Sequence, residues 1–289
     1  MYISGYVTFL SGAARLPLHE WPRLVHKRAK RLLVPFLLFG LAILCAKLVA
    51  SHFAVIDNVP ADLWDGLHAL VWDTARSPAT SVWYVTVLFV FCVVTPPLLA
   101  FDHSRVLLVA VAILFYLLPL PAPFYLDRIG TYFVFFVVGG LAADAGARWH
   151  RVMDATRWPA LGGLAAVAFL VSSGHIAFRW TEGAQGFPYK WALLIAGMLS
   201  LPAIHGLVRH RPLAQSTTLE RLGRYVFVIY LLNTPFIGVT KAVLLTVTSW
   251  DGSHFIGFAA IMMLAGTVGP ILTKRWVLRH VKSLDRMTD

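Results

Sequence analysis

The chain has 289 residues, of which 58% are hydrophobic and only 13% charged. Soluble domains usually carry about 25% charged residues and about 45–50% apolar ones, so this composition excludes an ordinary water-soluble protein. The formal net charge is +11. Because the basic residues form short runs between apolar segments, they indicate contact with membrane lipids and no nucleic-acid partner. Cys45 and Cys92 lie inside apolar runs without disulfide or metal-ligand spacing.

A membrane-spanning helix needs about 20 mostly apolar residues to cross the hydrocarbon layer. The long apolar segments here are continuous rather than alternating, which favours helices over the strands of a membrane barrel. The sequence therefore predicts an all-α, polytopic bundle with about eight full spans. The predicted spans are Leu32–Ala50, Val82–Ala100, Val106–Leu120, Ile129–Ala145, Trp158–Ser173, Trp191–Val208, Leu222–Leu245 and Phe255–Thr273.

The first apolar segment, Met1–Ala14, is shorter than a span. At 1.5 Å per residue it reaches about 21 Å. It has neither a charged leading region nor a cleavage-site pattern, so it is not a signal peptide. We expect a partial helix, the second half of a span that begins before Met1.

Lysine and arginine set the expected orientation, because they are enriched in cytoplasmic loops. When the loops are assigned alternately to two sides, most of the 25 basic residues fall on one side, together with the C-terminus. That side is predicted to be cytoplasmic, in the inner membrane of a bacterium. The other side receives only Arg76, Arg128, Arg179 and Lys190.

No repeat, low-complexity tract or linker divides the chain, so one membrane domain is expected over residues 1–289. Residues 1–14 would be its partial first helix and residues 274–289 a cytoplasmic tail. The longest outer segment is Ser51–Ser81.

A basic run, His26–Pro35, precedes the first full span and contains Lys27, Arg28 and Arg31. One interpretation is a membrane anchor that binds lipid phosphates. The other is a clamp for a phosphorylated cytoplasmic donor, since arginine side chains match phosphate oxygens in pairs. The sequence leaves both interpretations open.

Polar residues interrupt the seventh predicted span at Asn233, Thr234 and Pro235. Counted from Leu222, Asn233 would lie about 17 Å deep, near the midplane. Polar groups at that depth face protein or water, and a proline frees a backbone carbonyl and kinks the helix. A functional site and a structural kink bonded to a neighbouring helix fit this segment equally well.

Five segments, taken in order along the chain, carry motifs of one known family. They are Met1–Val7, Lys30–Pro35, Val82–Val85, Tyr132–Gly139 and Gly223–Pro235. Together they resemble the membrane acyltransferase 3 family. The first segment is similar to its Ile-Ser-Gly-Tyr signature, and the second to the arginine-rich segment that ends in proline. The later three resemble its Leu-Trp-Phe-Leu, Phe-Phe-x-x-Gly and Ile-Tyr-Leu-x-His-x-Pro patterns.

This resemblance implies about ten spanning helices and transfer of an acyl group, often acetyl or succinyl, from cytoplasmic acyl-CoA to a glycan hydroxyl. Acyl-CoA would be a donor substrate, and no resident cofactor or metal is implied. The acceptor would be a surface polysaccharide or a lipid-linked saccharide. Arg28 and Arg31, with Lys27 beside them, would bind the donor, and Ser4 would lie deep in the membrane.

Two differences from the family pattern concern the chemistry. The family's first helix, which carries an arginine and the histidine favoured as base, has no counterpart here. The late histidine is replaced by Asn233, which cannot take a proton but can orient a hydroxyl group. A truncated product, a mis-assigned start and an inactive relative are the alternatives that follow.

The leading hypothesis is a membrane O-acyltransferase. Ser4, Tyr230 and Asn233 would act at the reacting groups, and Trp83 and Tyr84 would contact the substrate or form an aromatic belt at the membrane surface. An alternative is a transporter or flippase for a glycan or lipid-linked precursor, with a broken helix at Asn233–Pro235. A third is a structural subunit of an envelope-synthesis complex.

Overall fold

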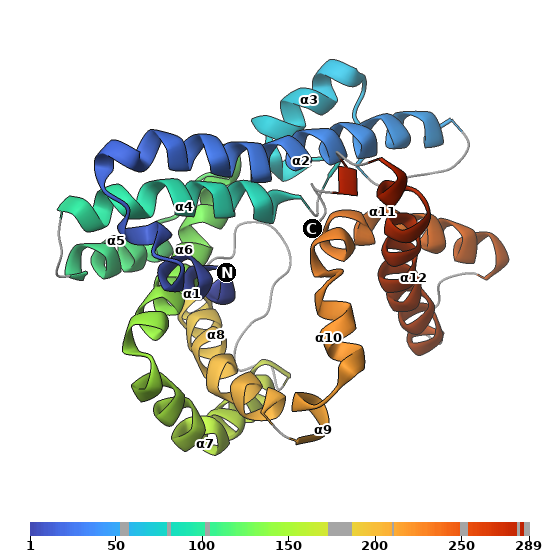
Figure 1. Cartoon of the computed structure of the whole chain (residues 1–289). Coiled ribbons are helices and arrows are strands. Elements are labelled where there is room, and N and C mark those ends of the chain that lie inside the picture. Colours follow the sequence, from blue (N-terminus) through green and yellow to red (C-terminus); the bar gives the residue numbers. More distant parts are fainter. Residues whose placement is uncertain are drawn as a thin grey trace. The chain divides into compact units, whose positions relative to one another are not determined.

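The computed structural model describes residues 1–52, 58–79, 82–101, 105–172, 187–209, 211–248, 254–281 and 284–285. Every regular element among these residues is a helix (Figure 1), which confirms the predicted all-α class. Ser173, Arg179 and parts of the expected outer segment and tail lie outside the described residues.

The main helices follow the predicted spans in order, with short helices between them (Figure 1). The α-helices are α1 (Tyr2–Leu10), α2 (Trp21–Ala50), α3 (Leu63–Val71), α4 (Trp83–Phe101), α5 (Val106–Leu117), α6 (Leu126–Ala145), α7 (Ala147–Ser172), α8 (Phe187–Val208), α9 (Arg211–Ala214), α10 (Thr217–Gly223), α11 (Val226–Val247) and α12 (Phe255–Trp276). The 3-10 helices are η1 (Ala13–Arg15), η2 (Leu18–Glu20), η3 (Thr74–Arg76), η4 (Pro123–Tyr125) and η5 (Leu278–His280).

Six helices among the described residues are long and apolar enough to cross a membrane: α2, α4, α6, α8, α11 and α12. These confirm six of the eight predicted spans. The remaining two predicted spans coincide with α5 and α7. Helix α5 has 12 residues, and the first half of α7 is polar.

Three helix boundaries differ from the prediction. Helix α2 begins at Trp21, so the basic run is part of a 30-residue helix that is about 45 Å long. Helix α11 begins at Val226, four residues after the predicted start, because the chain leaves α10 at Gly223. Helix α12 continues to Trp276, so the expected tail starts within its last turn.

The chain divides into two compact units that alternate along the sequence. Unit 1 contains residues 1–15, 98–119 and 130–219, and unit 2 contains residues 16–97, 120–129 and 220–289. Three of the divisions fall inside helices, namely α4, α6 and α10.

In unit 1, glycines allow α1 and α6 to approach closely. A Cβ atom at Gly139 would overlap the backbone carbonyl of Tyr2, and one at Gly5 would overlap the carbonyl of Phe136. Small residues allow this backbone contact, which is the usual way in which helices associate in lipid. The early Ser-Gly segment is therefore a packing element of unit 1.

An ion cluster joins three helix ends in unit 1. The side chain of Asp144, at the end of α6, is 9% exposed and pairs with Arg15 and Arg105. Arg105 Nη2 lies 3.0 Å from Asp144 Oδ2. A shielded carboxylate needs such partners, so Asp144 fastens the segment after α1 and the start of α5 to α6.

Helices α7 and α8 pack side by side in unit 1 and share a second polar cluster. Arg209 Nη1 donates to Asp154 Oδ2 at 2.7 Å, and His205 Nε2 lies 3.6 Å from Asp154 Oδ1. The rings of His150 and His205 stack at 5.4 Å. These contacts hold the ends of the two helices together.

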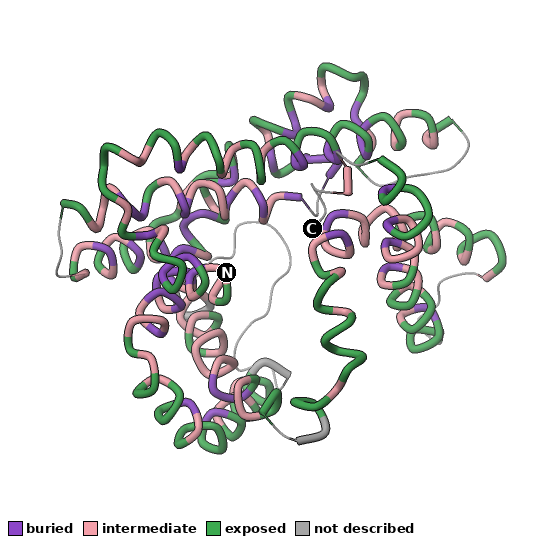
Figure 2. The backbone as a smooth tube through the Cα atoms, in the orientation of Figure 1, coloured by how far each residue is buried: buried purple, intermediate pink, exposed green. Residues whose placement is uncertain are grey.

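In unit 2, α11 and α12 form the most extensive helix pair. The side chains of Ile237 and Phe236 fill the spaces beside Gly266 and Gly269 of α12. Large apolar residues elsewhere on this pair are exposed (Figure 2), including Val247 at 81% and Ile256 at 82%. Lipid contact accounts for this exposed apolar surface, which water would disfavour.

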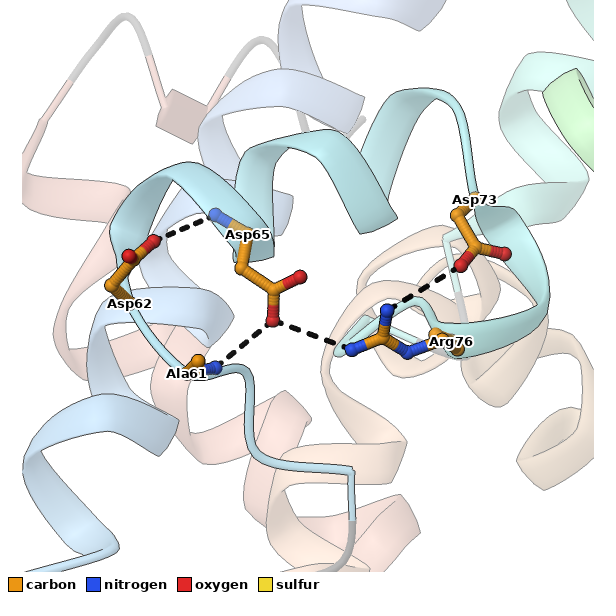
Figure 3. Close-up of polar contacts among 5 residues, drawn as sticks. All are labelled: Ala61, Asp62, Asp65, Asp73 and Arg76. Carbon is orange, nitrogen blue, oxygen red and sulfur yellow. Dashed lines mark hydrogen bonds and ion pairs between the residues drawn. The ribbon is translucent and has the colours of Figure 1, made fainter.

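The segment between α2 and α4, in unit 2, is held by a network of side chains around α3 (Figure 3). Asp62 caps α3 by accepting the backbone N–H of Asp65 at 2.8 Å. Asp65 in turn accepts the N–H of Ala61 at 3.0 Å. Arg76 lies 3.5 Å from Asp65 and 3.6 Å from Asp73, so it joins both ends of the segment.

We predict that Gly139→Ala destabilises the protein, because the added methyl group would push α1 away from α6. Overpacking of this kind typically costs about 1–3 kcal/mol. The measurement is helix content at 222 nm during thermal unfolding in detergent. Gly162→Ala is the matched control, because it lies in α7 with no described atom near the added methyl group. Equal midpoints for the two variants would contradict the close contact.

We predict that Asp62→Ala lowers stability by about 1 kcal/mol, the usual effect of losing a helix cap. Asp62→Asn should leave stability nearly unchanged, because its amide oxygen also accepts the Asp65 N–H. Thermal unfolding of both variants tests this. If the asparagine variant loses as much as the alanine variant, the cap does not stabilise α3.

Candidate functional site

The start of α4 is buried and is held by a tyrosine from α11. The backbone N–H of Tyr84 donates to the hydroxyl oxygen of Tyr230 at 2.9 Å. The two aromatic rings lie 5.2 Å apart at an angle of 59°. Val82 and Val85, on either side of Tyr84, are fully buried. The first-turn N–H groups of a helix have no partner inside the helix, so Tyr230 supplies one here.

Arg128, at the beginning of α6, extends this cluster. Its guanidinium carbon lies 4.8 Å from the ring centre of Trp83. A cation over an indole face is stabilising, more so when water is excluded. From the sequence, Arg128 was predicted only to be an outer-loop charge. Its position at the start of an apolar run, after Asp127, was the one available signal.

The loop before Arg128 is fixed by an unusual backbone conformation. Phe124 and Tyr125 both have positive φ, at 54° and 59°. The Tyr125 hydroxyl donates to the carbonyl of Leu70 at 3.3 Å, and its backbone N–H donates to Thr74 Oγ1 at 3.2 Å. Non-glycine residues persist in this conformation only when their surroundings hold them. The contacts with Leu70 and Thr74 provide that restraint beside Arg128.

Asn233 lies one turn after Tyr230 on α11. Its side-chain oxygen accepts the Thr234 hydroxyl at 3.1 Å. The helix continues through Pro235, so the predicted break in this span is not present. Measured from Val226, Asn233 lies about 10 Å along the helix rather than about 17 Å. Asn233 is therefore nearer the start of the helix than predicted.

The contact between Tyr84 and Tyr230 also bears on how the chain crosses the membrane. Tyr84 is in the first turn of α4, and Tyr230 is in the second turn of α11. The charge distribution assigns the two helix starts to opposite surfaces, which are about 30 Å apart. A direct hydrogen bond requires that at least one start lies within the membrane, or that both lie on one side. Trp83 and Tyr84 therefore contact other parts of the protein. Aromatic residues that only form a belt at the membrane surface would not need such contacts.

The basic segment of α2 lies in the same unit as the aromatic cluster. Lys27 and Arg31 are exposed, and Arg28 is partly exposed. Trp21, at the start of α2, donates from Nε1 to the carbonyl of Val93 at 2.9 Å. This bond fastens the basic segment to α4, the helix that carries Trp83 and Tyr84.

A shallow hollow of about 420 Å³ lies against the basic segment. Most of its lining is apolar, with Leu33, Val34 and Leu37 beside His26 and Lys30. Among the described residues, no group of three or more His, Cys, Asp or Glu side chains is placed to hold a metal ion.

Ser4 belongs to unit 1 and is not part of this cluster. It lies on α1 beside Gly5, and its carbonyl accepts the hydroxyl of Thr8 at 2.7 Å. Of the predicted site residues, the structure therefore brings together Trp83, Tyr84 and Tyr230. Asn233 follows on the same helix, and the basic residues lie on a helix fastened to α4.

Comparison with known families decides the class of the protein. The model of the Acyl_transf_3 family, described as an acyltransferase domain, matches residues 1–275. The chain belongs to the acyltransferase 3 family. The acyltransferase has no match among the curated proteins or among the solved structures.

Family membership and the six apolar helices together make the protein an integral membrane acyltransferase. The resemblance found in the sequence is thus confirmed over nearly the whole chain. The match covers residues from both compact units. The family match does not show which of the predicted site residues act in the reaction, so their roles stay predictions.

We predict that Tyr230→Phe destabilises the acyltransferase. The substitution leaves the partly buried Tyr84 N–H without its acceptor, and an unsatisfied group of this kind typically costs about 1–3 kcal/mol when buried. Tyr225→Phe is the matched control on the residue that precedes α11, because the structure shows no hydrogen bond from the Tyr225 hydroxyl to a described residue. Thermal unfolding in detergent should show a lower midpoint for Tyr230→Phe alone. Equal midpoints would show that the bond does not hold α4.

Proposed function

We propose that this membrane acyltransferase moves an acyl group, acetyl or succinyl, from cytoplasmic acyl-CoA to a hydroxyl group of a glycan or lipid-linked saccharide. The single observation that carries the proposal is the cluster of Tyr84, Tyr230, Trp83 and Arg128 at the buried start of α4. It gathers polar groups from three helices, α4, α6 and α11.

Acyl transfer needs stabilisation of the negative charge that develops on the thioester oxygen. The Tyr230 oxygen already accepts the Tyr84 N–H, so its own O–H proton is directed elsewhere. We assign this O–H as a donor to the developing oxyanion, with the positive charge of Arg128 in the same cluster as support. In the net reaction, the acceptor oxygen forms a C–O bond, the C–S bond breaks, and the hydroxyl proton ends on the CoA thiol.

Asn233 has the role of orienting the acceptor hydroxyl. It lies about 5 Å along α11 from Tyr230, close enough for both side chains to reach one bound group. Its amide can both donate and accept a hydrogen bond, but it cannot take the acceptor's proton. The hydroxyl of Thr86 is also buried near the start of α4, without a hydrogen-bond partner among the described residues. A bound hydroxyl group would satisfy it.

The donor phosphates are assigned to Arg28 and Arg31, with Lys27 adding charge. Arg28 and Arg31 are three residues apart on α2, so they share one helix face. The bond from Trp21 to Val93 supports this assignment, since it fixes the basic segment against α4. Both groups lie within a short distance of this hydrogen bond. Arg28 is about 10 Å along α2 from Trp21, and Tyr84 is about 14 Å along α4 from Val93.

Trp83 and Tyr84 are assigned to the glycan acceptor, because aromatic rings suit the apolar faces of sugars and both rings are partly exposed. Ser4 keeps its assignment to the reacting groups on the resemblance alone. An inner-membrane location with a cytoplasmic C-terminus belongs to the same proposal and is supported by the charge distribution. A transporter is less well supported, because α11 is continuous where a broken helix was expected.

The test is transfer of radiolabel from acetyl-CoA or succinyl-CoA by the purified chain in vesicles that contain envelope glycolipids. We expect label in the saccharide fraction. Arg28→Gln with Arg31→Gln should raise the KM for acyl-CoA about tenfold with little change in kcat, as expected for lost donor contacts. Asn233→Ala should instead lower kcat, since the acceptor would be misoriented.

Arg148→Gln is the control for general charge effects, because Arg148 is exposed on α7 of unit 1. It should leave both constants unchanged. Failure of wild-type protein to transfer label from either donor to any envelope saccharide would overturn the proposed reaction.

A further inference from the structure

A basic hollow in unit 2 lies apart from the aromatic cluster, where α10 meets α11 and α12 ends. Its volume is about 510 Å³. Tyr225 and Ile271 form part of the wall. The charged lining residues are Arg221, Arg224, Lys274, Arg275, Arg279 and Asp285.

The lining is strongly basic, with Lys274 buried and the arginines exposed. Of the charged lining residues that the structure describes, five are basic and one, Asp285, is acidic. Lys274 is 8% exposed, and its Nζ atom lies 3.9 Å from Asp285 Oδ1. One carboxylate offsets one of these cations, so the hollow keeps an excess of positive charge. Gathering like charges is unfavourable unless an anion lies among them.

The start of α11 adds to this field. Tyr225 precedes the first helical residue, Val226, and its side chain does not cap the helix. A helix of 22 residues carries a partial positive charge at its first turn, where backbone N–H groups point outward. Such a turn favours an anion. The helix start and the arginine cluster thus act on the same hollow.

We propose that this hollow is a phosphate-binding site, separate from the donor segment on α2. The ligand is a phosphate monoester or diester, held by paired arginine N–H groups, which fit phosphate oxygens better than a single ammonium group does. The volume is within the range of pockets that bind small ligands. Two sources supply this chemistry: the head group of an anionic phospholipid, and the phosphates of a soluble nucleotide.

The site is built from local sequence features. Arg221 is in the last turn of α10, which ends at Gly223, and Arg224 follows on the turn that leads into α11. Lys274 and Arg275 are in the last turn of α12, where cations also stabilise the helix end. The proposal does not depend on acyl transfer, since its ligand is recognised by charge and shape alone.

The experiment measures binding to the purified full-length chain in neutral detergent. One arm uses equilibrium dialysis with radiolabelled adenosine 3′,5′-bisphosphate. The other arm uses native mass spectrometry to compare retention of phosphatidylglycerol with retention of phosphatidylcholine. We expect at least one phosphate ligand to bind, with phosphatidylglycerol retained over phosphatidylcholine if the source is lipid. Because the donor segment on α2 also offers phosphate contacts, a soluble source is indicated by bisphosphate binding that Arg224→Gln with Arg275→Gln weakens.

The variant is Arg224→Gln with Arg275→Gln, and the matched control is Arg148→Gln with Arg151→Gln on α7, which removes the same charge from exposed positions. We expect the site variant to weaken binding at least tenfold and the control less than twofold. Arg275→Gln alone serves if the double variant does not fold, because Arg275 is exposed. Absence of binding to wild-type protein, or equal loss in site and control variants, would overturn the proposal.

Discussion

The hydrogen bond from the Tyr84 N–H to the Tyr230 hydroxyl is the interaction on which the proposed site depends. When a helix starts away from water, no water molecule can accept hydrogen bonds from its first-turn N–H groups. Each N–H group left unsatisfied in hydrocarbon costs several kcal/mol. The side chain of Tyr230 satisfies one such group from another helix. It thereby fixes the start of α4 against α11 and brings Trp83 and Arg128 into the same cluster.

In lipid, the hydrophobic effect does not bring helices together. Each unit instead holds its helices together through small residues and paired charges. Glycines bring α1 to α6 and α12 to α11, and Asp144 joins three helix ends through two arginines. The rest of the apolar surface is left for lipid. Polar groups gather in a few places against this background, and the aromatic cluster and the basic hollow are two of them.

The sequence predicted the elements better than their contacts. Apolar runs of about 20 residues identify α2, α4, α8 and α12 because only a membrane requires them. The start of α11 was misplaced because Gly223 and Tyr225 divide an apolar run that hydropathy alone treats as continuous. The pairing of Tyr84 with Tyr230 joins residues 146 positions apart, and nothing in a single sequence encodes that distance. Arg128 was missed for the same reason, since its partner Trp83 lies on another helix.

Cross-linking across the Tyr84–Tyr230 contact in intact membranes tests the central claim most directly. Tyr84→Cys and Tyr230→Cys would be combined in a background with Cys45→Ser and Cys92→Ser, then treated with a short bifunctional thiol reagent. The account predicts an intramolecular cross-link, seen as one joined peptide pair after proteolysis. If each cysteine reacts singly but the pair is never joined, α4 and α11 do not meet there, and the proposed site is wrong.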